Sequence, residues 1–175
     1  MSTFLKILAL SIFSFSAIAA DKPDLKVPGG LPKLTVSFVD AETWNGKRWL
    51  KTQQCKQNGG VSPLRSPALN VSGAPAGTNK LVVFINNPRS FHNHGLYSYQ
   101  AKSEDGSYMV PAVATHATDK LPKGVALFQG GSSWSAAFNS ACPSSGSWKF
   151  TLTVYALDEQ EQVIAINESD IGWSE

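Results

Sequence analysis

The fold class is decided by one segment, Trp148-Lys149-Phe150-Thr151-Leu152-Thr153-Val154-Tyr155-Ala156-Leu157-Asp158. Its first seven residues alternate between large apolar side chains and Lys or Thr, which predicts a half-buried β-strand. A second segment, Leu81 to Ile85, is a continuous apolar run rich in β-branched residues, which is typical of a strand buried on both faces. Residues 34–38 alternate like the first segment. The strongest patterns in the chain therefore predict β-strands.

The remaining segments agree with a β domain. Stretches rich in Gly, Pro, Asn and Ser separate the strands, and weaker strand candidates lie at Met109 to Ala114 and Val125 to Phe128. No window predicts a convincing amphipathic helix, and the best candidate, Asp158 to Asn167, suits a strand as well. Short strands punctuated by turns indicate a mostly β domain, either a sandwich or a barrel.

Residues 1–20 have the pattern of a cleavable signal peptide. Lys6 gives a positive start, an apolar run follows, and Ala17 and Ala19 are the small residues that a signal peptidase requires. The run is too short to span a bilayer, so a membrane anchor is the weaker interpretation. We therefore expect an exported protein, either periplasmic or secreted.

The mature chain of about 155 residues suits a single domain at 33–175, preceded by an irregular arm at 21–32. The full sequence has 15 Lys and Arg residues against 13 Asp and Glu residues, a formal net charge of +2. A near-neutral surface without basic runs argues against nucleic acid as a partner and against a polybasic membrane site.

Cys55 and Cys142 are the only cysteines. In an exported protein an even number of cysteines indicates a disulfide. Such a bond would close a loop of nearly 90 residues, worth about 4 kcal/mol in the chain-entropy account. Two free thiols or one redox-active thiol are the alternatives, although neither cysteine lies in a C-x-x-C motif.

Motifs of common enzyme classes are absent from the sequence. There is no G-x-S-x-G elbow, P-loop or dinucleotide fingerprint, so we expect neither an enzyme nor a cofactor. His92, His94 and His116 could supply three imidazoles to zinc, but no carboxylate or cysteine lies nearby at ligand spacing, and we expect no metal. Trp134, in a Gly/Ser-rich loop, is the tryptophan that best suits a binding surface.

Four segments, two of which overlap the strands described above, occur in order along the chain and carry a family resemblance. They are Ser66-Pro67-Ala68-Leu69 followed by Ala74-Pro75-Ala76-Gly77-Thr78, the strand ending in Asn87-Pro88-Arg89-Ser90, Leu121-Pro122-Lys123-Gly124-Val125, and Phe138-Asn139-Ser140-Ala141-Cys142-Pro143 through Gly146 to Val154-Tyr155-Ala156-Leu157-Asp158. Together they resemble the phosphatidylethanolamine-binding protein family, also called Raf-kinase-inhibitor-like proteins. The resemblance covers roughly residues 34–173, and its last segment is the most specific. It implies an antiparallel-rich β-sandwich with few short helices and a small anion-binding pocket at one end.

The resemblance also supports the disulfide, because Cys55 falls where exported bacterial members carry a cysteine. The family pocket binds phosphate-like head groups with two acidic residues and two histidines. Here Asn87 and Arg89 replace the acidic pair, Trp148 replaces one histidine, and His94 corresponds to the other. The helix that follows V-Y-A-L-D in the family is missing from this sequence.

The resemblance implies a non-enzymatic protein that binds a small anionic or polar ligand. Its candidate ligand-binding residues are Asn87, Pro88, Arg89, His94, Phe138 and Trp148. In this hypothesis Arg89 holds the anion, His94 donates a hydrogen bond and Asn87 orients His94, so Arg89 and His94 should converge on one concavity. The alternative is a protein-binding or inhibitory module, resembling relatives associated with protease and kinase inhibition, that has lost the pocket.

Overall fold

The computed structural model describes residues 23–55, 59–61, 63–89, 92–100, 103–128, 136–143 and 147–174. The predicted signal peptide and Trp134 lie outside these residues. The strands in the described ranges are β1 (Thr35–Phe38), β2 (Arg48–Trp49), β3 (Leu69–Ser72), β4 (Lys80–Asn87), β5 (His92–Tyr99), β6 (Tyr108–Val110), β7 (Val125–Leu127), β8 (Lys149–Leu157) and β9 (Val163–Ser174). The helical structure in those ranges is one 3-10 turn, η1 (Lys51–Gln53).

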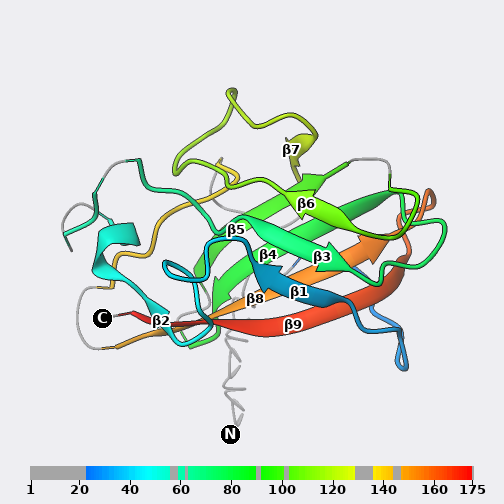
Figure 1. Cartoon of the computed structure of the whole chain (residues 1–175), viewed down its shortest axis with the longest axis horizontal. Coiled ribbons are helices and arrows are strands. Elements are labelled where there is room, and N and C mark those ends of the chain that lie inside the picture. The colour runs from blue at the N-terminus through cyan, green and yellow to red at the C-terminus, as the bar shows by residue number, and fades with distance from the viewer. Residues whose placement is uncertain are drawn as a thin grey trace, which may run out of the picture.

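The strands form two sheets that face each other (Figure 1). The larger sheet has the order β2-β9-β8-β4-β5-β7, and all its pairs are antiparallel except the short β2–β9 pair. The smaller sheet, β1-β3-β6, is antiparallel throughout and lies in front of the larger one in Figure 1. The predicted mostly β, sandwich-like fold is confirmed.

Side chains of β4 alternate between two hydrophobic clusters. Leu81, Val83 and Ile85 belong to the main core, together with residues of β3 and β6, so this core lies between the sheets. Val82 and Phe84 belong to a second cluster on the outer face of the larger sheet. A strand that buries both faces needs apolar residues at every position, which explains the continuous run in the sequence.

The half-buried pattern predicted for the β8 segment holds only for its first residues. Lys149 and Thr151 are partly exposed, but every residue from Leu152 to Leu157 is buried. The outer face of β8 is buried because the second cluster is covered by Leu25 and Leu31 of the N-terminal arm. Within the predicted alternation, which ends at Val154, the exception is Thr153, a polar residue that is buried instead of exposed.

A tight turn joins β8 to β9 at the beginning of the Asp158 to Asn167 segment, for which the sequence was compatible with either a helix or a strand. The Asp158 carboxylate accepts hydrogen bonds from the backbone N–H groups of Gln160 and Gln162, both at 2.9 Å. Glu161 adopts a left-handed backbone conformation with a φ of 61°. The chain then enters β9 directly at Val163, so the helix missing from the sequence pattern is also missing from this turn.

The Ser66-Pro67 segment links the two sheets. Ser66 is buried, and its Oγ accepts a hydrogen bond from the Val113 N–H at 2.9 Å. The same hydroxyl lies 3.5 Å from the hydroxyl of Tyr97 on β5. Burial raises the pKa of Tyr97 to about 12, so this phenol stays protonated and can donate a hydrogen bond to the Ser66 hydroxyl.

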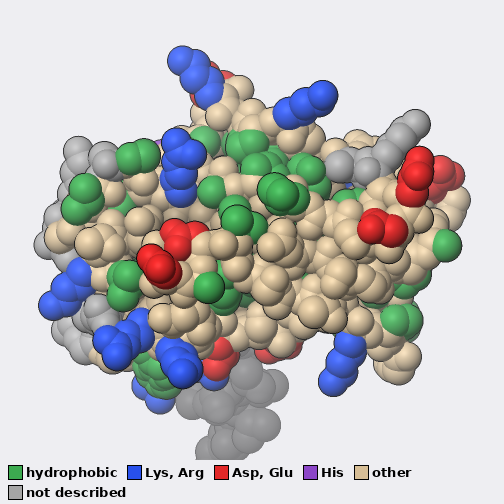
Figure 2. Space-filling model, viewed as in Figure 1, with side chains coloured by type: hydrophobic (Ala, Val, Ile, Leu, Met, Phe, Trp, Pro, Cys, Tyr) green, Lys and Arg blue, Asp and Glu red, His purple; other side chains and the backbone are tan. Residues whose placement is uncertain are grey.

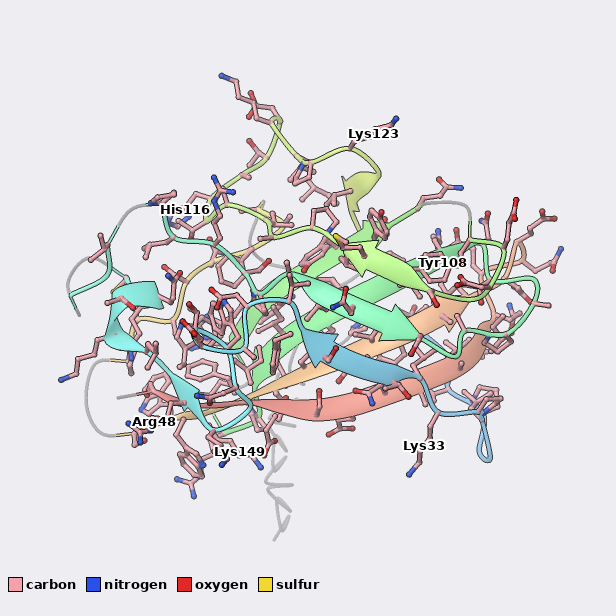
Figure 3. All side chains as sticks on the ribbon, in the orientation of Figure 1. Lys33, Arg48, Tyr108, His116, Lys123 and Lys149 are labelled. Atoms are coloured by element: carbon pink, nitrogen blue, oxygen red, sulfur yellow. A yellow bond between two sulfur atoms is a disulfide. The ribbon has the colours of Figure 1, made fainter. Side chains whose placement is uncertain are left out.

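The surface carries charges of both signs. Figure 2 shows Lys and Arg side chains interspersed with Asp and Glu over the face that bears the smaller sheet. In Figure 3, Arg48 and Lys149 lie close together at one corner, and Lys33 and Lys123 lie well apart from them. In the described part of the chain, no helix is long and apolar enough to cross a membrane.

Candidate functional site

A pocket of about 460 Å³ lies near the beginning of β5. Its described lining residues are Cys55, His92, Asn93, His94, His116, Asn139, Ser140, Cys142 and Trp148. These residues come from five separate segments of the chain, which the fold brings together at one end of the larger sheet. All three histidines of the sequence are among them.

The loop formed by residues 136–143 makes one wall of the pocket and is fixed against β5. The Leu96 N–H donates to the Ala137 carbonyl at 3.1 Å, and the Asn139 N–H donates to the His94 carbonyl at 2.7 Å. Gly95 lies at the centre of this approach and forms an antiparallel bridge with Phe138. The loop thus extends the sheet by a short, irregular pairing beside β5.

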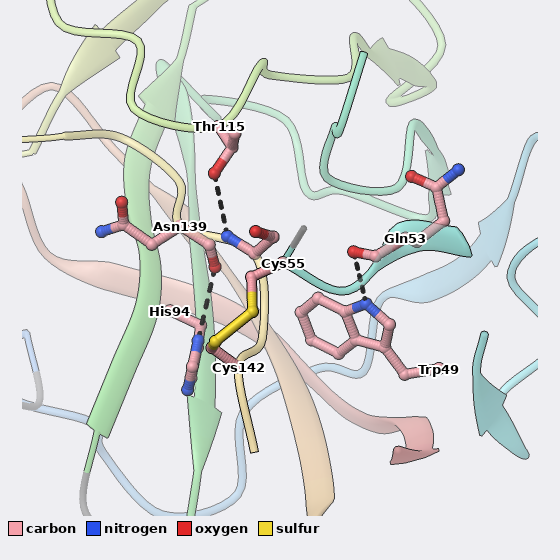
Figure 4. Close-up of a disulfide and its surroundings, with 8 residues drawn as sticks. Trp49, Gln53, Cys55, His94, Thr115, Asn139 and Cys142 are labelled. Atoms are coloured by element: carbon pink, nitrogen blue, oxygen red, sulfur yellow. Dashed lines mark hydrogen bonds between the residues drawn. A yellow bond between two sulfur atoms is a disulfide. The ribbon is translucent and has the colours of Figure 1, made fainter. Parts of the chain in front are cut away.

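The predicted disulfide is confirmed and holds the other end of that loop. Cys55 and Cys142 are bonded, with their Cα atoms 5.2 Å apart. The Cys55 N–H also donates to the Ala141 carbonyl at 2.8 Å, and the Ser140 N–H donates to Thr115 Oγ1 at 3.0 Å. Figure 4 shows the disulfide beside His94 and the Asn139 carbonyl. The disulfide therefore fastens the end of the pocket-lining loop to the segment that contains Cys55.

A β-bulge aims His94 at this loop. Ile85 pairs with Gly95 and Asn86 pairs with Asn93, which leaves His94 as the extra residue on β5. Such a bulge bends its strand and redirects a side chain from the normal alternation. The redirection places the His94 ring on the side of the main core.

Aromatic side chains pack around the His94 ring. Its centroid lies 5.0 Å from the Phe150 ring and 6.2 Å from the Trp49 ring, both in edge-on geometry. Trp49 in turn stacks on Phe138 at 6.2 Å and contacts Trp44 at 5.3 Å. The Trp49 indole N–H donates to a carbonyl of η1 at 3.0 Å, which fixes the tryptophan and hence the surroundings of His94 (Figure 4).

This environment keeps His94 neutral. The pKa of His94 is lowered to about 4, chiefly by burial and also by neighbouring His92, while the hydrogen bond to the Asn139 carbonyl acts in the opposite direction. His94 Nδ1 lies 3.3 Å from that carbonyl oxygen. Because a carbonyl only accepts, Nδ1 must carry the proton, and Nε2 of the neutral ring is then an acceptor.

Three buried polar atoms on pocket-lining residues have no hydrogen-bond partner among the described residues. They are Asn93 Nδ2, His94 Nε2 and Asn139 Oδ1. Buried polar atoms are nearly always paired, and each exception calls for an explanation such as a functional role or a bound water or ion. The fourth such atom in the described chain, Asn167 Oδ1, lies on β9 and does not belong to this pocket.

Two of the six predicted ligand residues, His94 and Trp148, line this pocket. Asn87 is buried at the end of β4, and its Oδ1 accepts a hydrogen bond from the Arg89 N–H at 2.9 Å. Pro88 is exposed, and Phe138 lies in the core stacked on a tryptophan.

Arg89 is not among the pocket-lining residues. Its guanidinium lies 5.9 Å from the ring centroid of Trp173, an exposed residue of β9 whose cross-strand partners are Arg48 and Lys149. The structure thus places Arg89 with a basic group of side chains around Trp173, and the expected convergence of Arg89 with His94 on one concavity is not observed.

His92 and His116 share the pocket with His94, as the zinc interpretation would require. Within the described ranges, however, no group of three or more His, Cys, Asp or Glu side chains is placed to hold a metal ion. His92 and His116 are exposed, whereas His94 Nδ1 faces the Asn139 carbonyl. The arrangement suits hydrogen bonding better than coordination.

Sequence reasoning missed Asn93, Asn139 and Ser140 as pocket residues, and it treated the two cysteines only as structural. Asn139 lies within the segment that carried the family resemblance, but an asparagine in a loop is by itself uninformative. The usable clue was position: Asn93 is adjacent to His94, and Asn139 and Ser140 immediately precede the disulfide.

The arrangement of the two facing sheets belongs to a fold that is already known. It is the fold of the phosphatidylethanolamine-binding proteins, as the four sequence segments predicted.

Among solved structures, Escherichia coli YbcL, described as a member of the mammalian phosphatidylethanolamine-binding protein family, matches with a TM-score of 0.58 and 19% identity. The match covers 82% of this chain and 98% of YbcL. A phosphatidylethanolamine-binding protein homolog from Chlamydia trachomatis matches with a TM-score of 0.50 and 17% identity, over 82% of this chain and 97% of the homolog. At these identities the likeness establishes the fold. No family sequence model matches the chain, and no curated protein matches it.

Proposed function

We propose that this protein is a non-enzymatic, exported binding protein that holds a small polar or anionic ligand noncovalently in the pocket around His94. The observation that carries the proposal is the cluster of unpartnered buried polar atoms on Asn93, His94 and Asn139, all residues of one pocket. A ligand that pairs with these atoms removes a cost of about 1–3 kcal/mol for each of them.

The rest of the pocket supports binding rather than catalysis. Its walls are held by a disulfide, by backbone pairing to β5 and by packed aromatic rings. A rigid wall lowers the entropy lost on binding. His94 accepts at Nε2 and is too weakly basic to remove a proton efficiently near neutral pH. The disulfide supports an oxidising, extracytoplasmic location.

A thermal-shift screen tests the proposal. The protein is heated with phosphate, phosphoethanolamine, small carboxylates, amides and polyols, each at about ten times its dissociation constant. Binding at that concentration adds about 1.4 kcal/mol to the free energy of unfolding, which raises Tm by about 4 °C for a domain of this size.

Two variants make the screen specific for the pocket. Trp148→Ala removes one wall, and we expect it to abolish the shift. Trp173→Ala is the matched control, because Trp173 is exposed and does not line the pocket. A shift that survives Trp148→Ala but is lost in Trp173→Ala would move the binding site to the basic group around Trp173 and refute the proposal.

A second candidate function, the protein-binding module, is favoured by an apolar groove elsewhere on the surface. Tyr99, Met109, Pro111 and Pro122 line a cavity of about 630 Å³, and Met109 is 67% exposed. Figure 2 shows hydrophobic side chains gathered over the upper part of this face, where β6 and β7 lie in Figure 1. Partner capture that is lost in Met109→Asp and kept in Trp148→Ala would support this second function.

A further inference from the structure

For Asn93 and His94, the direction of the unpartnered hydrogen bond can be assigned from the contacts of the same side chain. Asn93 Oδ1 accepts a hydrogen bond from the Gly95 N–H at 2.9 Å. This fixes the amide orientation, so the unpartnered Nδ2 of Asn93 is a donor. Asn93 is 8% exposed, so the donor belongs to a well-buried side chain.

The other two unpartnered atoms are acceptors. His94 Nδ1 must donate to the Asn139 carbonyl, which leaves a lone pair on Nε2. Asn139 Oδ1 is a carbonyl oxygen and only accepts. The three atoms thus make one donor and two acceptors on the residues that line a single pocket.

The described lining of the pocket has no permanently charged side chain. None of its nine described lining residues is Lys, Arg, Asp or Glu. Because His94 has a pKa of about 4, its ring adds no positive charge at neutral pH. Arg89, which the sequence predicted would bind an anionic ligand, lies against Trp173 instead.

These features oppose a purely anionic ligand. A carboxylate or phosphate oxygen that approaches His94 Nε2 or Asn139 Oδ1 brings lone pairs together without a proton between them. An anion also loses much of its hydration in a pocket whose described lining offers no Lys or Arg, which costs free energy. A neutral group that both donates and accepts can instead pair with all three atoms.

On the basis of the proposed function, we infer that the pocket selects neutral ligands that carry hydrogen-bond donors, such as primary amides and polyols, over anions of the same shape. The donors of the ligand meet His94 Nε2 and Asn139 Oδ1, and its acceptor meets Asn93 Nδ2. The aromatic face of Trp148 covers the apolar part of the ligand. The polar atoms are well covered, so a small rearrangement of side chains accompanies binding.

Acetamide and acetate test the inference directly. They have nearly the same shape, but acetamide donates and acetate only accepts. Each is titrated at pH 8 and constant ionic strength into protein labelled with ¹⁵N-histidine, and the side-chain resonances of His94 are followed by NMR. We expect acetamide to shift the Nε2 resonance and to bind at least tenfold more tightly than acetate or inorganic phosphate.

Two variants separate pocket recognition from nonspecific effects. His94→Phe keeps an aromatic ring against Phe150 but removes the Nε2 acceptor, and we expect acetamide affinity to fall at least fivefold. Asn139→Ala removes Oδ1 and keeps the backbone carbonyl that fixes the neighbouring histidine, so it tests the second acceptor without disturbing that ring. For this variant too we expect weaker acetamide binding. Its backbone amide spectrum should stay dispersed, which shows that the variant is folded.

The possible outcomes are distinguishable. Acetate or phosphate binding at this pocket as tightly as acetamide would overturn the inference and leave the proposed function standing. If neither acetamide, acetate nor phosphate perturbs any pocket resonance, both the inference and the proposed function fail. Acetamide binding that is unchanged in both variants would place the amide elsewhere and would also overturn the inference.

Discussion

Acidification should destabilise this protein through His94, and the size of the effect follows from its burial. The pKa of His94 falls from 6.5 to about 4 because the folded chain removes the ring from water. The unfolded chain therefore binds this proton at a higher pH than the folded chain does. Stability is fully present above pH 6.5 and is lost as the pH falls toward 4. Between pH 7.5 and pH 4.5 the loss from this one group is about 2.5 kcal/mol.

Chemical denaturation of wild type and His94→Gln at several pH values measures this contribution. Other titrating groups are common to both proteins, so the difference between the two free energies of unfolding isolates His94. That difference should shrink by about 2.5 kcal/mol between pH 7.5 and pH 4.5. Trp173→Ala, at an exposed, non-titrating position outside the pocket, is the control and should keep the wild-type pH dependence. Parallel curves for wild type and His94→Gln would refute the burial argument.

Three further perturbations test the fold and the site. Replacing Cys55 and Cys142 by Ala should lower the free energy of unfolding in urea by about 4 kcal/mol, because the disulfide joins residues that are 87 positions apart. A loss below about 1 kcal/mol would contradict this. Ser66→Ala leaves the buried Val113 N–H without its acceptor and should lower stability by about 1–3 kcal/mol, whereas a neutral result would show that the backbone relaxes. Arg89→Ala should change acetamide affinity measured by NMR less than twofold, because Arg89 does not line the pocket; a tenfold loss would restore its proposed ligand role.

The sandwich could be predicted from sequence because its strands carry their burial pattern locally. The continuous apolar run of β4 indicates a strand that is buried on both faces, and the apolar–polar alternation at the start of β8 indicates a strand that is buried on one face. The burial of Tyr155 in the second half of β8 could not be predicted, because tyrosine is an ordinary surface-strand residue until the cluster covered by Leu25 and Leu31 encloses it. Burial by a distant segment leaves no mark on local periodicity.

The pocket could be predicted only in part. His94 and Trp148 were found because they occupy positions that resemble a known family. The role of Asn93 and Asn139 depends on a one-residue bulge in β5 and on a loop laid beside it, and neither feature has a sequence signature. Which polar atoms remain unpartnered can be known only after every contact of the folded chain is in place.

Arg89 shows the opposite case. Its position after a predicted strand, where the resembling family has an acidic residue, made it the obvious candidate for holding an anion. The structure instead gives it an aromatic partner, Trp173, from the last strand. A long cationic side chain can reach several neighbours, and its choice depends on tertiary contacts.

A crystal structure of the protein with a bound amide tests the central claim most directly. The account predicts density for the amide in the pocket between Asn93 and Trp148, with its nitrogen about 3 Å from His94 Nε2. Density over Trp173 and Arg89, or in the groove beside Met109, with the His94 pocket holding only water, would contradict it.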